Sequence, residues 1–302
     1  MTASYQQDKL YRQLKTALAK TSSSDLKEWG SKSAARLPKI AARRVKNLGA
    51  LLSALAKFTG KELSAAIRAL REGRFGTHFG DRAANAIDGT IDLSKRITLA
   101  TTAIGKALFD DPKKNAPGVL ALALGFLGGS GGLDANGGVP DTDIVLGGIG
   151  SHRSIFTHSI VAGILVEGAI YAVADLADVV CEKLPASERD PFWDRLVEAK
   201  NTIAQQLAVG ASAGIAYHLG VDATLQPGAY HGLPGSMPME AHQTLLAMNA
   251  VTEGLDSAHK DETTGRKVVS GIKTAGSAVV KSAVAGAESV WTFAKTQMTG
   301  KL

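Results

Sequence analysis

Histidine and aspartate side chains, which bind divalent transition metals, occur in several short motifs of this chain. Mixed imidazole and carboxylate donors suit zinc, manganese or iron better than calcium or magnesium. The motifs hold enough donors for one or two ions, and zinc is the first expectation. The expected ligands are His78, Asp141, Asp143, His152, His158, His218 and Asp222, with His231 as a further candidate.

The spacing within two of these motifs places both donors on one side of the chain. In the PDTD motif, Asp141 and Asp143 point the same way if the segment is extended, because side chains alternate along an extended backbone. In the YHLGVD motif, His218 and Asp222 share one face if the segment is helical, because they are i and i+4. Each motif therefore predicts a pair of donors.

The GSHRSIFTHS motif is less simple, because its two histidines are six residues apart. On one helix, that spacing would separate the side chains by about 120°. His152 and His158 converge only if His152 precedes a helix and His158 lies in its first turn, with Ser154 as the capping residue. The long apolar stretch that follows predicts the buried helix that anchors this pair.

A metal ion held by these donors would activate water for the hydrolysis of a phosphoester. Arg153 is adjacent to His152, and its guanidinium group could bind a phosphate through two hydrogen bonds. We expect a carboxylate such as Asp143 to orient or deprotonate the attacking water. The catalytic residues predicted from the sequence are Asp143, Arg153 and His152.

Helical periodicity dominates the elements that must position these residues, and strand signals are weak throughout. The apolar spacing predicts helices at about 5–20, 47–58, 61–73, 154–182, 191–217 and 239–256. We expect loops at 21–25, 110–118 and 128–143, the last because six glycines interrupt it. The predicted fold is therefore all-α: a helical bundle with the metal site at helix ends and loops, flanked by amphipathic helices.

Composition divides the chain into three parts. Residues 1–74 form a basic helical segment with 16 Lys+Arg against 5 Asp+Glu, whereas the rest of the chain has 18 against 23. Residues 75–260 form the predicted hydrolase-like domain, and residues 261–302 a C-terminal amphipathic helix. The basic segment could contact nucleic acid, anionic lipid or an acidic partner, or it could present a solvated helical face.

Other features narrow the class of protein. Cys181 is the only cysteine, which excludes an intrachain disulfide and a cysteine-rich zinc site. We see no apolar secretory signal in the N-terminal residues. The apolar stretch 159–180 is long enough to span a membrane, but it contains Glu167, Asp175 and Asp178, whose charges are costly in lipid. We therefore expect a buried helix there, and a cytoplasmic protein or one peripheral at the inner membrane.

At the metal-ligand motifs the sequence resembles a family of metal-dependent hydrolases of bacterial inner membranes, the LexA-binding type. That family has an early GH or TH, then LPDIDH, then GHRGxTHS before an apolar helix, then GYLSHxxxDxxTPxG. In the same order, the chain has GTHFG at 76–80, VPDTDI at 139–144, SHRSIFTHS at 151–159 and AYHLGVDATLQPG at 216–228. Ile144 stands where the family has a histidine.

The resemblance covers residues 76–235 and implies which residues form the metal and catalytic set. That set is His78, Asp141, Asp143, His152, His158, His218 and Asp222. The HLGVD segment followed by His231 is also similar, more distantly, to zinc-dependent phospholipases C and single-strand nucleases. Those enzymes are all-α and hydrolyse phosphodiesters with clustered zinc.

Three functions compete at this point. The first is a metal-dependent hydrolase of phosphoesters. Phospholipid is favoured as its substrate, because amphipathic ends suit an anionic membrane surface and few aromatic residues are present to stack bases. A metal-dependent nuclease, with residues 1–74 as the nucleic-acid contact, is the alternative. The second function is a non-enzymatic membrane- or partner-binding effector with a structural metal, and the third is a membrane-damaging effector that acts through its C-terminal helix.

Overall fold

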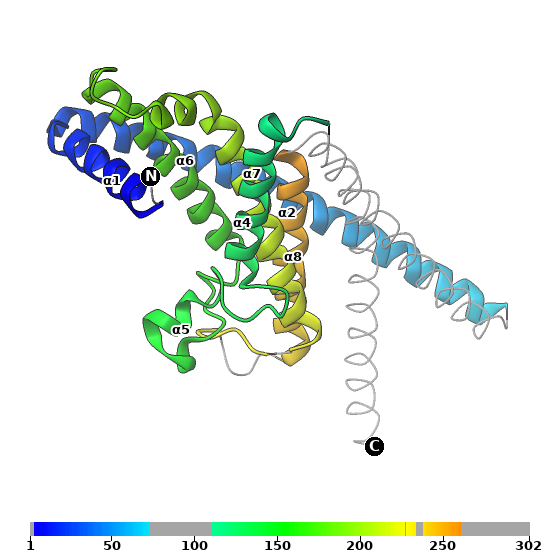
Figure 1. The fold of residues 1–302 in the computed structure, drawn as a ribbon. Coiled ribbons are helices and arrows are strands. Elements are labelled where there is room, and N and C mark those ends of the chain that lie inside the picture. The colour runs from blue at the N-terminus through cyan, green and yellow to red at the C-terminus, as the bar shows by residue number, and fades with distance from the viewer. Residues whose placement is uncertain (1–2, 73–109, 227, 234–237, 261–302) are drawn as a thin grey trace.

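The computed structural model describes residues 3–72, 110–226, 228–233 and 238–260. Within these ranges every regular element is a helix, apart from one isolated bridge, and this confirms the all-α prediction. The helices are α1 (Ala3–Ala19), α2 (Ser23–Arg71), α4 (Pro112–Ser130), α5 (Thr142–Gly147), the 3₁₀ turn η1 (Ile149–Ser151), α6 (Ile160–Lys183), α7 (Pro191–Thr224) and α8 (Met239–Lys260) (Figure 1). The predicted ligand His78 and the predicted helix 261–302 lie outside the described residues.

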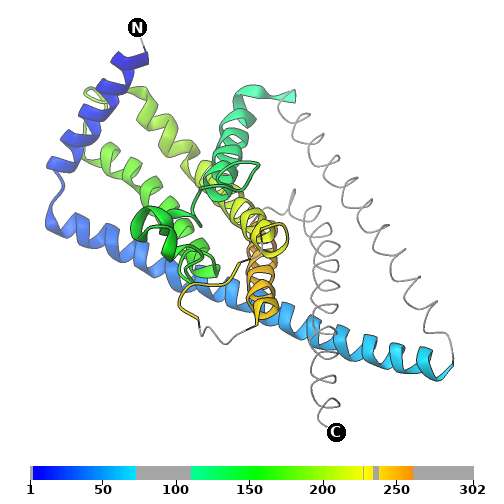
Figure 2. The ribbon, with the colours of Figure 1, turned by 90° about the horizontal axis from the view of Figure 1, so that it is seen from below.

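Helix α7 is central to the bundle, because it packs against α4, α6 and α8. Helix α1 packs against α6, while α2 crosses α6 and α8 and continues beyond them (Figure 2). The short α5 and the loops around it lie at one end of the bundle (Figure 1). Most of the predicted ligands belong to that end.

The N-terminal part of the chain is two helices, and α2 is one continuous helix of 49 residues. Ser22 caps α2, since its Oγ accepts from the N–H of Asp25 at 3.2 Å and its own N–H donates to the Asp25 carboxylate at 2.8 Å. The separate helices predicted at 47–58 and 61–73 were therefore wrong. Gly60 does not end α2, because a glycine inside a helix costs only about 1 kcal/mol.

Two predicted loops are also wrong in part. The segment 110–118 is mostly the start of α4, in which Pro112 takes the first helical position that proline favours. The glycine-rich segment 128–143 begins as the last turn of α4 and ends in α5. From the sequence we interpreted these glycines as helix breakers, but several of them allow close packing of helices instead.

Four glycines bring the backbones of α4 and α7 into direct contact. A Cβ added to Gly125 or Gly129 of α4 would collide with backbone carbonyls of α7. A Cβ added to Gly210 or Gly214 of α7 would collide with backbone carbonyls of α4. This glycine seam ends at Ser130, and it therefore fixes the last turn of α4 beside the residues of α7 that follow Gly214.

Basic residues of α2 pair with acidic residues of α6 and α8. Arg44 is fully buried, and its guanidinium group lies 2.7 Å from Glu167, 2.6 Å from Glu253 and 3.0 Å from Asp256. Arg43 contacts Glu167 at 2.7 Å and Asp256 at 2.5 Å. Part of the positive charge of residues 1–74 is thus matched inside the bundle.

One helix in the described ranges, α6, is long and apolar enough to cross a membrane. This is a weak indication, because core helices of soluble proteins pass the same test. Glu167 and Asp175 of α6 are buried and paired with arginines of α2, as a packed helix requires. However, Leu165 and Val173 are 56% and 65% exposed, so α6 is not buried on all sides as the sequence predicted.

Candidate metal centre

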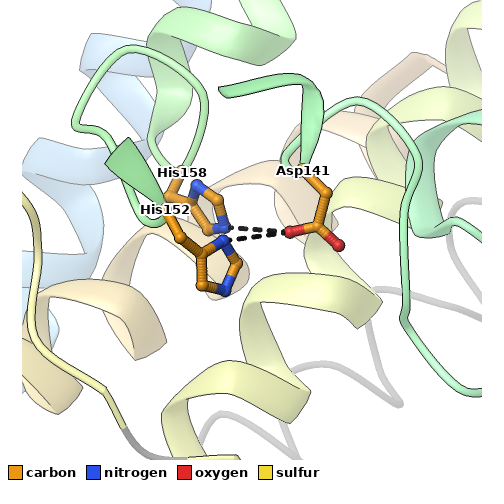
Figure 3. A group of neighbouring side chains, drawn as sticks. All are labelled: Asp141, His152 and His158. Carbon is orange, nitrogen blue, oxygen red and sulfur yellow. Dashed lines mark ion pairs between the residues drawn. The ribbon is translucent and has the colours of Figure 1, made fainter. Parts of the chain in front are cut away.

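Five side chains from three segments of the chain converge at the end of the bundle that holds α5: the start of α5, the loop before α6, and α7. They form two overlapping groups, and in each group the donor atoms lie within 4.8 Å of one another. The groups are Asp141, His152 and His158 (Figure 3), and His158, His218 and Asp222. We refer to these five residues as the donor cluster. His158 belongs to both groups and joins the loop donors to those of α7.

Within each group of the donor cluster, the distances between donor atoms suit ligands of one ion. Asp141 Oδ1 lies 3.3 Å from His152 Nδ1, 3.6 Å from His218 Nε2 and 3.8 Å from His158 Nε2. Asp222 Oδ2 lies 3.4 Å from His158 Nε2 and 3.5 Å from His218 Nε2. Donor atoms that surround zinc tetrahedrally at about 2.0–2.1 Å are about 3.4 Å apart. The cluster therefore needs little rearrangement to bind metal.

The atoms that face the centre of the cluster lack hydrogen bonds. Asp141 Oδ1, His152 Nδ1, His158 Nε2 and Asp222 Oδ2 are buried and have no partner among the residues that the structure describes. Buried polar atoms are normally hydrogen-bonded, because burial removes their hydrogen bonds to water and an unpaired atom gains no bond that replaces them. Four such atoms that face one another are the arrangement that a bound cation would stabilise.

The histidine atoms that face away from the centre do have partners. His158 Nδ1 lies 3.2 Å from Asp143 Oδ2 and 3.0 Å from Thr157 Oγ1, so its proton is held there and Nε2 is left with a free lone pair. His218 Nδ1 lies 3.1 Å from the carbonyl oxygen of Ser130, at the end of the glycine seam. Such outer hydrogen bonds fix the tautomer and orientation of metal-binding histidines.

The aspartates follow the same rule. Asp222 Oδ1 accepts from Arg153 at 2.9 Å, and Asp141 Oδ2 accepts from the N–H of Gly137 at 2.5 Å. In both residues the other oxygen is the unpaired one that faces the cluster. Every aspartate of the donor cluster is therefore anchored by one oxygen and presents the second.

The protonation states also suit metal binding. Burial lowers the pKa of His218, which keeps its imidazole neutral near pH 7. Burial alone would raise the pKa of Asp222, but its contacts with His158 and Arg153 outweigh burial and lower it. A neutral imidazole and an ionised carboxylate are the forms that coordinate metals.

Asp141 and Asp143 converge with the histidines by a different local structure from the one expected. They are not in an extended loop, because Asp141 is the N-cap residue of α5 and Asp143 lies in its first turn. Asp143 Oδ2 accepts from Ser154 N–H at 2.8 Å and from Thr157 Oγ1 at 2.7 Å. Asp143 therefore holds the histidine loop in place, while its Oδ1 is buried, unpaired and 3.7 Å from His152 Nδ1.

The position of His158 also differs from the prediction. Helix α6 begins at Ile160, and its cap is Ser159, whose Oγ accepts from the N–H of Val161 at 3.2 Å. His158 thus lies before the helix, and the prediction of Ser154 as the cap was wrong. The reason is that Ser154 closes a turn instead, in which its carbonyl accepts from the N–H of His158 at 2.9 Å.

Arg153 has an unusual backbone, with φ +63°, a left-handed conformation that costs a residue other than glycine about 1–2 kcal/mol. Its Nη2 donates to Asp222 and, at 2.8 Å, to the carbonyl of Gln226. A Cβ added to Gly228 would collide with the guanidinium group, so any larger residue there would force Arg153 to move. Its buried Nε has no hydrogen-bond partner among the described residues.

His231 is not part of the donor cluster, because its side chain is exposed. Its N–H donates to the carbonyl of Arg153 at 3.0 Å, next to the isolated bridge between Ser154 and His231. In this extended segment alternate side chains face opposite ways, and the buried one is Tyr230. His242 is also buried, and its Nδ1 accepts from the N–H of Tyr230 at 3.1 Å.

Sequence reasoning missed the residues that hold the donors. Ser130 lies in a glycine-rich run, Tyr230 is next to His231, and Thr157 lies within the SHRSIFTHS motif. Only the alternation around Tyr230 could have indicated its role. Comparisons of the chain with protein-family models, curated proteins and solved structures find no match.

Proposed function

We propose that this chain is a metal-dependent hydrolase of phosphoesters that uses one divalent ion, with zinc as the first candidate and manganese or iron as alternatives. The observation that carries the proposal is the set of buried, unpaired atoms that face one another in the donor cluster. Three imidazole nitrogens and two carboxylate oxygens form a donor set that suits these metals. The motif order shared with the inner-membrane hydrolase family supports the same reading.

When bound, the metal would lower the pKa of a water and polarise the phosphoryl oxygen. Asp143 Oδ1, unpaired beside His152, is placed to orient or deprotonate that water. Arg153 Nη2 holds Asp222, and the positive charge of this side chain, which is 15% exposed, would offset the negative charge of a bound phosphate. His152 completes the catalytic set at the edge of the cluster.

Access to the cluster favours catalysis over a purely structural metal. The side chains of His152 and Asp141 are 21% and 13% exposed, whereas those of His158, His218 and Asp222 are at most 4% exposed. The side of the cluster formed by His152 and Asp141 is the less buried one, and we expect water and substrate to reach the metal from there, whereas structural zinc sites are closed.

Exposed apolar side chains in the segments that carry the donor cluster favour a lipid substrate. Six large apolar side chains of these segments are 44–86% exposed, and we refer to them as the apolar rim. The apolar rim consists of Leu133, Val145, Leu146, Ile155, Phe156 and Leu225. Leu133 follows Ser130 by three residues, and the other five lie within four residues of a donor or catalytic residue in the sequence. Exposed apolar patches mark surfaces that meet other molecules or membranes, and an anionic phospholipid surface is the partner we propose, with the protein peripheral at the inner membrane.

The test compares a soluble phosphodiester, phospholipid vesicles, and single- and double-stranded nucleic acid, each with zinc or manganese. We expect vesicle hydrolysis by the wild type and none by His218→Ala or Asp222→Ala. Val145→Ser with Leu146→Ser should reduce vesicle hydrolysis but spare the soluble ester, whereas Leu120→Ser should change neither. Leu120 is a matched control, because it is 60% exposed but about 15 Å along α4 from Ser130.

Two outcomes would count against this function. Hydrolysis of nucleic acid alone would favour the nuclease, with residues 1–74 as its contact. Hydrolysis of no substrate by metal-loaded protein would favour a binding protein with a structural metal.

A further inference from the structure

A buried hydrogen-bond chain connects α8 to the backbone of His158. The hydroxyl of Tyr230 donates to the carbonyl of His158 at 2.5 Å, and it accepts from Nδ2 of Asn249 at 3.1 Å. The Oδ1 of the same Asn249 accepts from the N–H of Ile160 at 3.1 Å. One asparagine of α8 thus holds both the tyrosine that contacts His158 and the first residue of α6.

His158 is the donor on which such a contact has the greatest effect. It belongs to both groups of the donor cluster, its side chain is fully buried, and it lies in a turn rather than in a helix. Its ring is held by Asp143 and Thr157, and its backbone by Ser154 at the N–H and by Tyr230 at the carbonyl. Among the described residues Tyr230 is the one that bonds to this carbonyl, so loss of its hydroxyl lets the turn and the ring of His158 move together.

We propose that Tyr230 and Asn249 are positioning residues of the metal centre, which set the place of His158 and thereby couple the position of α8 to metal affinity. This rests on the metal centre of the proposed function but not on the hydrolysis of any substrate. Neither residue was among those predicted from the sequence.

The ring of Tyr230 has a second, purely structural role, because it packs in the core cluster with Ile215, Leu219 and Leu246. The test therefore removes the hydroxyl and keeps the ring. Tyr230→Phe is compared with Tyr171→Phe, which removes a tyrosine hydroxyl on α6 near Arg36 and away from the donor cluster. Leu184→Ala is the control for lost stability, because Leu184 packs in a different core cluster, with Ala17, Val180 and Trp193, which contains neither Tyr230 nor a residue of α8.

The readouts are the affinity of the full chain for Co²⁺, measured by competition with a chelator, and the visible absorption bands of the bound Co²⁺. Loss of an outer hydrogen bond typically weakens metal affinity about 10- to 100-fold, and we expect a loss in that range for Tyr230→Phe with shifted absorption bands. Asn249→Ser should produce the same changes. Tyr171→Phe and Leu184→Ala should bind Co²⁺ as the wild type does, although Leu184→Ala should melt at a lower temperature.

Wild-type affinity and absorption bands in Tyr230→Phe would overturn the proposal. So would an equal loss of affinity in Leu184→Ala, because stability alone would then explain the effect. If Tyr230→Phe does not fold, Asn249→Ser decides in the same way. A wild type that binds no Co²⁺ would refute the positioning role and the metal centre together, whereas Co²⁺ binding without hydrolysis would refute only the proposed reaction.

Discussion

Arg153 donates to one oxygen of Asp222 at 2.9 Å and leaves the other oxygen of that carboxylate facing His158 and His218. The two residues come from a left-handed loop position and from the last turns of α7. Arg153 therefore orients Asp222, a candidate metal ligand, independently of any contact with a substrate. This contact explains why the chain tolerates a strained backbone at Arg153.

Gly228→Ala should disturb this contact from outside the donor cluster. A Cβ at position 228 would overlap the guanidinium group, so Arg153 must move and release Asp222. We expect metal affinity to fall about 10- to 100-fold, as for other outer contacts of metal ligands. Isothermal titration of the chelator-treated protein with Zn²⁺ measures this loss.

The control is Gly220→Ala, since a Cβ at that helical position meets no atom within 4 Å. Alanine there should leave metal affinity unchanged and stabilise α7 by up to about 1 kcal/mol. Equal Zn²⁺ affinities for the two alanine variants would contradict the orienting role of Arg153.

Arg44→Leu should destabilise the bundle strongly. The substitution leaves the buried carboxylates of Glu167, Glu253 and Asp256 with fewer cations, and breaking a buried ion pair typically costs about 3–5 kcal/mol. Denaturation in urea measures the free energy of unfolding of each variant. Arg12→Leu on the exposed surface of α1 should change it by less than about 0.5 kcal/mol. Similar free energies of unfolding for both variants would show that the ion pairs of Arg44 do not stabilise the packing of α2 in the bundle.

The stability of the contact between α1 and α7 should depend on pH through Asp190. Hydrogen bonds from Lys9 and from the N–H of Phe192 lower the pKa of Asp190 from 3.8 to about 2. Because the folded-state pKa is the lower one, this stabilisation is present above pH 3.8 and is lost as the pH falls towards about 2.

Asp190→Asn keeps a side chain that can cap α7 but removes the charge. The difference in melting temperature between the wild type and this variant should therefore be largest above about pH 4 and should shrink as the pH falls to about 2. A constant difference over that range would contradict the pairing with Lys9.

The site was more predictable from the sequence than the helices that carry it. Histidine and aspartate identify donors by their chemistry alone, so His158, His218 and Asp222 could be named before any geometry was known. Position within an element is harder, because capping depends on which of several serines closes the turn, and Ser159 rather than Ser154 caps α6. Gly129 was misread for a similar reason, since only the packing partner decides whether glycine breaks a helix or permits close contact. His231 and Tyr230 are neighbours, and their opposite orientations depend on the register of one short extended segment.

The metal content of the full chain tests the central claim most directly. Protein purified without chelator, or loaded with zinc or manganese and then desalted, should contain about one divalent ion per chain by elemental analysis. His158→Ala should contain none, because it removes the donor shared by both groups, and it should keep the helical content of the wild type. A folded wild type that retains no metal after loading, or a His158→Ala variant that retains as much as the wild type, would contradict the account.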